Sequence, residues 1–164
     1  MFHRVTLIAV LLALLTVAHS VFAQELEGHA IVQSDGSLFI KNRVVRLYGI
    51  YIPPTNRQCR DWISPIRCDS RAVLALDFFV KGFIHCFEQA ENPDGSIDAV
   101  CYRGRSSFDP GTDLAAYLLQ RGWALALPNA PFEYHAMERI ARSQELGVWG
   151  WTIDSITEPL YPLR

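Results

Sequence analysis

Carboxylate and guanidinium side chains are the clearest candidates for chemistry in this sequence. Asp35, Asp94 and Asp98 carry hard oxygen ligands of the kind that Ca²⁺ prefers, and Arg46 carries a planar guanidinium that matches a phosphate group. A metal held by such carboxylates could neutralise the charge that develops on a phosphodiester during cleavage. The competing interpretation is local, because Asp94 falls in a turn-forming segment where carboxylates bond to their own backbone.

Aromatic side chains suggest a second kind of chemistry, which is stacking on bases or sugars. Tyr48 and Tyr51 follow Arg46 closely in the sequence. The three residues are therefore candidates for one ligand-binding surface. The alternative for aromatic residues in general is a place in the core.

Four cysteines, an even number, favour two disulfides in an oxidising compartment. Of the three possible connectivities, the local one joins Cys59 to Cys68 and Cys86 to Cys101. The first pair would close a short loop and the second would join two predicted strands. A zinc site is not favoured, because the sequence has no C-x-x-C pair.

The N-terminal segment has the pattern of a secretory signal peptide. Arg4 precedes an uncharged apolar stretch over 5–18 that is short for a membrane span of about 20 residues, and the segment 21–23 fits a cleavage site. We expect residues 1–23 to be removed, which leaves an exported protein, periplasmic or secreted, with no membrane span; the alternative is an uncleaved anchor. The remaining chain has 14 basic against 17 acidic residues, which speaks against non-specific binding to polyanions.

The elements that must position these residues follow from periodicity and turn signals. The predicted order is three strands between residues 30 and 47, a helix over 69–80, strands over 83–87 and 97–102, and helices over 112–122 and 131–146. Five strands with a helix after the third is the order of an OB-type barrel. The sequence thus predicts one α+β domain over 24–154, a five-stranded OB-type Greek-key barrel with three helices, followed by a Pro-rich tail over 155–164.

Ordered landmarks resemble the staphylococcal nuclease (thermonuclease) family, in its exported bacterial branch. The resemblance covers 28–149 and rests on short segments: Gly28-x-Ala30-x-Val32, Val45-Arg46-Leu47-Tyr48-Gly49-Ile50 followed by Pro53, Gln58-Cys59, Asp113-Leu114, Gly122-Trp123-Ala124, Ala141-Arg142 and Leu146-Gly147-Val148-Trp149. It implies the OB-type fold and Ca²⁺-dependent hydrolysis of DNA and RNA. In that chemistry two carboxylates and a carbonyl hold the metal, a glutamate positions water and two arginines hold the phosphate.

Position by position, the resemblance assigns most of these roles to residues that cannot perform them. Arg46 matches one phosphate-binding arginine, and Ser96 stands where the second is expected. The first metal aspartate falls on Gly36, or on Ser37 with a one-residue gap. The second falls on Tyr51, and Pro54 replaces the glutamate that positions water.

These substitutions predict a pseudo-nuclease with no cofactor, a binding or scaffolding module of the cell envelope. Its partner would be an oligosaccharide, a nucleic acid or another envelope protein. One alternative is an active Ca²⁺-dependent phosphodiesterase with Asp35, Asp94 and Asp98 as substitute ligands and Arg46, Arg103 or Arg105 on phosphate. Another is an accessory role in exopolysaccharide (succinoglycan) biosynthesis, as some exported members of the resembled family have. A cleft with Tyr51 in place of an anionic ligand would suit a neutral or sugar-like molecule better than a phosphate.

Overall fold

The computed structural model describes residues 25–53 and 71–150. The predicted leader (1–23), the predicted Cys59–Cys68 disulfide, Pro54 and the tail (155–164) lie outside these ranges. Across 25–53 and 71–150, no helix has both the length and the apolar character that crossing a membrane requires.

The first described segment forms short strands that turn back on one another. Strands β3 (Leu38–Ile40) and β4 (Arg43–Leu47) are joined by Lys41 and Asn42. The φ angles of these two residues, 47° and 64°, are the left-handed values that a tight two-residue hairpin requires. Leu38 pairs with Val45 across this hairpin, and both side chains are fully buried. The strands are β1 (Glu25–His29), β2 (Ile31–Val32), β3 (Leu38–Ile40), β4 (Arg43–Leu47) and β5 (Ile50–Tyr51).

A long hairpin of β6 (Phe83–Glu91) and β7 (Ile97–Arg103) forms the middle of the sheet. The strand order is β1-β6-β7-β4-β3-β2, and the short β8 (Thr112–Asp113) also pairs with β7. All neighbours along this path are antiparallel except β4 and β7, which run parallel and place Arg46 opposite Asp98. This pairing brings two candidate functional residues, Arg46 from the first half of the chain and Asp98 from the second, to the same part of the sheet.

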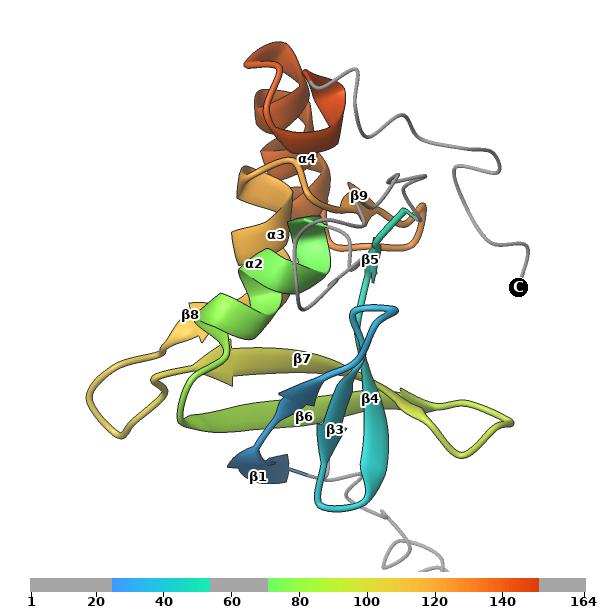
Figure 1. Cartoon of the computed structure of the whole chain (residues 1–164), viewed down its shortest axis with the longest axis vertical. Helices are drawn as coiled ribbons and strands as arrows, with labels where there is room; N and C mark the ends of the chain where they lie inside the picture. Colours follow the sequence, from blue (N-terminus) through green and yellow to red (C-terminus); the bar gives the residue numbers. More distant parts are fainter. Residues whose placement is uncertain (1–24, 54–70, 151–164) are drawn as a thin grey trace, which may run out of the picture.

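Three α-helices in the described part of the chain lie on one side of the curled sheet (Figure 1). They are α2 (Arg71–Phe79), α3 (Leu114–Gln120) and α4 (Phe132–Ser143), followed by a 3₁₀ turn η1 (Gly147–Trp149). Asp113 begins α3 as its N-cap, since its carboxylate accepts hydrogen bonds from the amides of Ala115 and Ala116. Buried residues of α2 and α3 pack with the sheet into one core.

The structure confirms an α+β fold in which a curled sheet forms a half-barrel covered by helices, but the predicted count of five strands is wrong. β1 was missed because its sequence, Glu-Leu-Glu-Gly-His, has one large apolar residue and therefore no visible alternation. β5 pairs with β9 (Leu125–Ala126) in a separate two-stranded sheet. Strands of two residues are too short to show the alternation of apolar and polar residues by which a strand is predicted.

Candidate functional site

The turn that carries Asp35 uses this carboxylate for its own geometry. Asp35 Oδ1 accepts a hydrogen bond of 2.9 Å from the amide of Ser37, and the Ser37 hydroxyl lies 2.6 Å from the same oxygen. The hydroxyl is also 2.6 Å from the side-chain oxygen of Gln33. Ser37 is almost fully buried. Ser37 and the Oδ1 atom of Asp35 therefore both stabilise this turn, although Asp35 itself is exposed.

Gly36, which the resemblance matches to the first metal aspartate, has no room for a side chain. Its φ of 83° is a left-handed value that side chains rarely adopt. A Cβ atom at this position would clash with Cδ1 of Ile52. Ile52 itself packs against the hydrophobic core. The aliphatic side chain of Ile52 therefore fills the space that an aspartate side chain at position 36 would need.

Arg46 forms an ion pair with Asp94, with 2.7 Å between Nη2 and Oδ2. Both side chains are about half-exposed. The other carboxylate oxygen, Oδ1, accepts hydrogen bonds from the hydroxyl of Ser96 at 2.5 Å and from its amide at 3.0 Å. The Ser96 hydroxyl is the main cause that lowers the pKa of Asp94, and the Arg46 charge acts in the same direction. Asp94 is thus a stable anion that neutralises Arg46.

The same turn connects Asp98 to this cluster through Asn92. The amide nitrogen Nδ2 of Asn92 donates to the Ser96 hydroxyl oxygen at 3.2 Å and to Asp98 Oδ1 at 3.0 Å. Asp98 and Ser96 are both almost fully buried. The resemblance assigns an arginine to position 96, but the buried Ser96 stabilises a turn instead.

Tyr48 lies in the turn between β4 and β5, and Tyr51 is the last residue of β5. The amide of Tyr48 donates to the carbonyl of Ala99, and Tyr51 pairs with Leu125 of β9. Both tyrosines are half-buried. Both lie within five residues of Arg46 in the chain and are partly accessible to solvent.

The aspartates proposed as substitute metal ligands do not come together as a compact ligand set. Within the described ranges, one group of three His, Cys, Asp or Glu side chains has ligand atoms all within 4.8 Å of one another, and it consists of Glu25, Glu27 and His85. The sequence reasoning did not identify this group. An available signal was the Glu-x-Glu spacing, which places both carboxylates on one face if the segment is a strand.

The two other arginines considered for phosphate binding lie over aromatic rings. The guanidinium carbon of Arg103 is 4.6 Å from the centre of the Phe79 ring, and that of Arg105 is 4.7 Å from the centre of the Phe87 ring. Such cation–π contacts hold an arginine against the surface. These two residues therefore have structural roles apart from Arg46.

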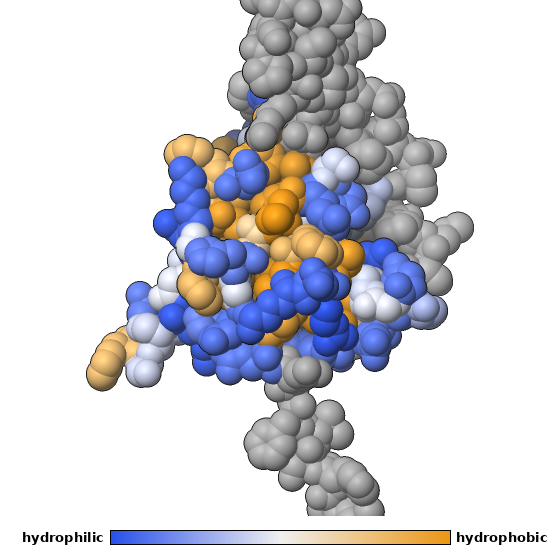
Figure 2. Space-filling view, turned by 60° about the horizontal axis from the view of Figure 1, so that its bottom comes forward, coloured by the Kyte–Doolittle hydropathy of each residue, from blue (hydrophilic) through white to orange (hydrophobic). Residues whose placement is uncertain are grey.

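Exposed aromatic side chains are distributed over several elements. Phe78 on α2, Phe83 on β6 and Phe132 on α4 are all more than half exposed, and Phe108 is 99% exposed in the loop before β8. The space-filling view shows apolar surface bordered by hydrophilic side chains (Figure 2). Each of these four exposed rings lies on a different element, so no single element carries several of them for stacking.

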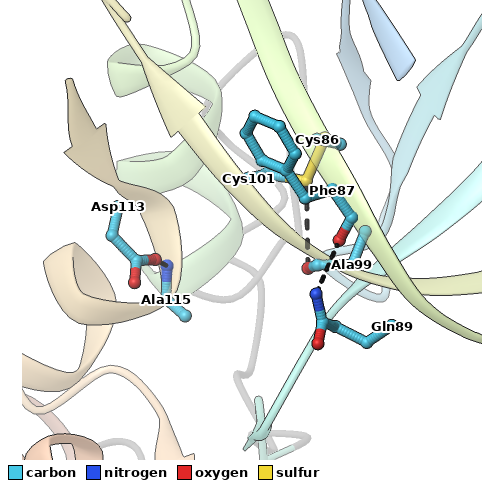
Figure 3. Close-up of a disulfide and its surroundings, with 7 residues drawn as sticks. All are labelled: Cys86, Phe87, Gln89, Ala99, Cys101, Asp113 and Ala115. Atoms are coloured by element: carbon cyan, nitrogen blue, oxygen red, sulfur yellow. Dashed lines mark hydrogen bonds between the residues drawn. A yellow bond between two sulfur atoms is a disulfide. The ribbon is translucent and has the colours of Figure 1, made fainter. Parts of the chain in front are cut away.

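A disulfide between Cys86 and Cys101 confirms one predicted pair (Figure 3). The two residues lie directly opposite each other on β6 and β7, and both are fully buried. Gln89 donates to the carbonyl of Phe87 beside this crosslink. The disulfide therefore fixes the register of the central hairpin.

Comparisons with known proteins give no identification. No protein-family model matches the chain, and no curated protein matches it. The nuclease resemblance therefore rests on the short sequence segments alone.

Proposed function

We propose that this chain is an exported, nuclease-like OB-fold domain without nuclease activity, which acts as a binding module in the cell envelope. The observation that carries the proposal is the 2.7 Å ion pair between Arg46 and Asp94. An arginine whose charge is already matched by a hydrogen-bonded carboxylate is a weak phosphate ligand, because a phosphate would have to displace that carboxylate or bind beside it.

The other positions support the same conclusion. Gly36 has no side chain, Ser37 is buried in a turn, and Tyr51 carries a phenol where the resemblance expects a carboxylate ligand. Loss of one electrostatic donor at an active site costs about 10²–10³ in rate. Several losses together would leave no useful phosphodiester cleavage.

Export is supported by the leader pattern and by the Cys86–Cys101 disulfide. Disulfides persist in oxidising compartments and are rare in the cytosol. The periplasm or the cell exterior fits both observations.

For the ligand, we favour a neutral or sugar-like molecule, with Arg46, Tyr48 and Tyr51 as the contact residues. A partly exposed tyrosine offers an apolar ring face and a polar hydroxyl, a combination that suits the faces and hydroxyls of a sugar. The net negative charge of the chain opposes a polyanion. An accessory role with an exopolysaccharide is one form of this proposal, and a nucleic acid or another envelope protein is the competing partner.

A cleavage assay tests the absence of catalysis. The purified protein is incubated with plasmid DNA, single-stranded DNA and RNA in Ca²⁺, Mg²⁺ or Mn²⁺, next to Arg46→Ala and Arg43→Ala variants. Arg43 is a matched control, since it lies on β4 and pairs with Glu88 instead. We expect no cleavage. Cleavage that Arg46→Ala abolishes and Arg43→Ala retains would contradict the proposal and favour the relocated-metal enzyme.

A binding screen tests the ligand class. Neutral oligosaccharides, acidic oligosaccharides and single-stranded oligonucleotides are titrated into the protein and into the Tyr48→Ala and Tyr51→Ala variants. Phe132→Ala removes an exposed ring on α4 and serves as the control. We expect oligosaccharide binding that is lost in the tyrosine variants alone. Oligonucleotide binding with the same dependence would replace the sugar-like ligand, and no binding to any of them would favour a protein partner.

A further inference from the structure

The cluster of Glu25, Glu27 and His85 lies on the β1–β6 strand pair, and no function assigned above uses it. Glu27 is directly opposite His85, and Glu25 is two residues before Glu27 on β1. Alternate residues of a strand point to the same face, so both carboxylates lie on the side of the sheet that His85 faces. His85 Nδ1 is 3.2 Å from Glu25 Oε1 and 3.4 Å from Glu27 Oε2.

These distances are those of ligands around one small cation. Zn²⁺ binds imidazole nitrogen and carboxylate oxygen at about 2.0–2.2 Å in tetrahedral geometry, which separates neighbouring ligand atoms by about 3.3 Å. The two measured separations, 3.2 and 3.4 Å, fall on either side of this value. All three ligand atoms lie within 4.8 Å of one another.

Hydrogen bonds from the imidazole alone cannot satisfy both carboxylates of the cluster. The Nδ1 atom of an imidazole carries at most one proton, so it cannot donate a full hydrogen bond to both carboxylates. Within the described ranges, the ion pairs recorded for Glu25 and Glu27 are both with His85. Two anions therefore share a single, half-buried imidazole, and a divalent cation would satisfy all three groups.

The surrounding structure holds the ligands in place. His85 precedes Cys86, whose disulfide to Cys101 crosslinks β6 to β7, and Ile84 on its other side is fully buried. The His85 side chain is 20% exposed, while the two glutamates are about half-exposed. A rigid imidazole and two more mobile carboxylates make a site that a cation can enter from solvent, with at least one position left for water.

We propose that Glu25, Glu27 and His85 form a binding site for a zinc-class divalent cation. Imidazole nitrogen with carboxylate oxygens suits Zn²⁺ and related transition metals better than Ca²⁺, which prefers oxygen ligands throughout. The site lies away from the Arg46–Asp94 pair and uses none of its residues. A bound cation would crosslink the edge strand β1 to the disulfide-bonded hairpin.

Calorimetric titration of Zn²⁺ into tag-free, oxidised protein tests the site. We expect one equivalent to bind, and Glu27→Gln and His85→Gln each to weaken binding by about tenfold or more. Glu133→Gln and His135→Gln on α4 are the matched controls and should bind as the unmodified chain does. No binding, or binding that Glu27→Gln and His85→Gln leave unchanged, would overturn the proposal.

A measurement on the unmodified protein removes the risk that a variant misfolds. Imidazole nitrogen resonances of His85 are followed by NMR as Zn²⁺ is added, with His29 and His135 as internal references. We expect the Nδ1 resonance of His85 to shift and saturate at one equivalent. A shift confined to another histidine, or none at any, would refute the site.

Discussion

The guanidinium of Arg46 and the carboxylate of Asp94 form an ion pair across 48 positions of sequence, with 2.7 Å between Nη2 and Oδ2. The same carboxylate closes the turn between β6 and β7 by accepting two hydrogen bonds from Ser96. Asp94 therefore both stabilises the turn and neutralises Arg46, the one phosphate-binding arginine that the resemblance retains in this sequence.

Releasing Arg46 should create a weak anion site. Asp94→Asn removes the partner charge but keeps an oxygen that can accept from Ser96. We expect inorganic phosphate, followed through the NMR signal of the Arg46 side chain, to bind a few-fold more tightly to this variant than to the unmodified protein. Asp109→Asn is the control, because Asp109 also closes a turn by accepting from Gly111 but pairs with no arginine among residues 25–53 and 71–150. Equal phosphate affinity in all three proteins would contradict the inference.

Acid should weaken the fold partly through Asp94. Its pKa is lowered in the folded protein, chiefly by the Ser96 hydroxyl. The stability that it contributes is therefore complete above the unfolded value, about 3.9, and is lost as the pH falls through the lower folded pKa. Between pH 5 and pH 2 we expect the melting temperature of Asp94→Asn and of Ser96→Ala to fall less than that of the unmodified protein. Parallel decreases would argue against this contribution.

Tyr134 connects α4 to the start of α3. Its hydroxyl donates to Asp113 Oδ2 at 2.5 Å, while Oδ1 of the same carboxylate caps α3. Burial first, and the Asp113 hydrogen bond second, raise the pKa of Tyr134. Tyr134→Phe should lower the free energy of unfolding in urea by about 1.5–3 kcal/mol, the value of a hydrogen bond to a charged group. Tyr117→Phe, whose ring stacks on Phe79, should change it by less than about 0.5 kcal/mol; an equal effect of both would be inconsistent with this assignment.

Gly36 and Gly95 form a matched pair for the packing of Ile52. Both have left-handed φ angles, 83° and 78°, but a Cβ would clash with Ile52 only at Gly36 and would meet nothing within 4 Å at Gly95. Each change to alanine should cost about 1–2 kcal/mol of unfolding free energy for the backbone alone. We expect Gly36→Ala to cost more than Gly95→Ala, and Ile52→Ala to reduce that excess. Equal costs would mean that Ile52 moves aside freely.

Local signals in the sequence predicted much of the fold. The predicted helices over 69–80 and 112–122 contain α2 and α3, and the local connectivity of the cysteines included the observed Cys86–Cys101 pair. These features depend on neighbouring residues or on a simple count. The short pairing of β5 with β9 depends instead on the position of two distant segments, which no local period encodes.

The candidate site was less predictable, because its contacts also join residues that are distant in the sequence. Substitutions at Gly36, Tyr51 and Ser96 were visible in the sequence, but the contact of Ile52 with Gly36 and the pairing of Arg46 with Asp94 depend on tertiary structure. The cluster of Glu25, Glu27 and His85 depends on the register of β1 against β6. A one-residue slip in that register would turn the imidazole to the opposite face.

The most direct test of the central claim is a Ca²⁺ titration followed by backbone amide NMR signals. Residue resolution separates the Glu25–Glu27–His85 cluster from the segments that hold the positions matched to the nuclease site, which are 34–37, 46–52 and 94–98. If the nuclease-like metal site has been lost, these amides should show no saturable shift up to millimolar Ca²⁺. Saturable shifts of one stoichiometric equivalent in these three segments would contradict the account and restore a metal-dependent enzyme.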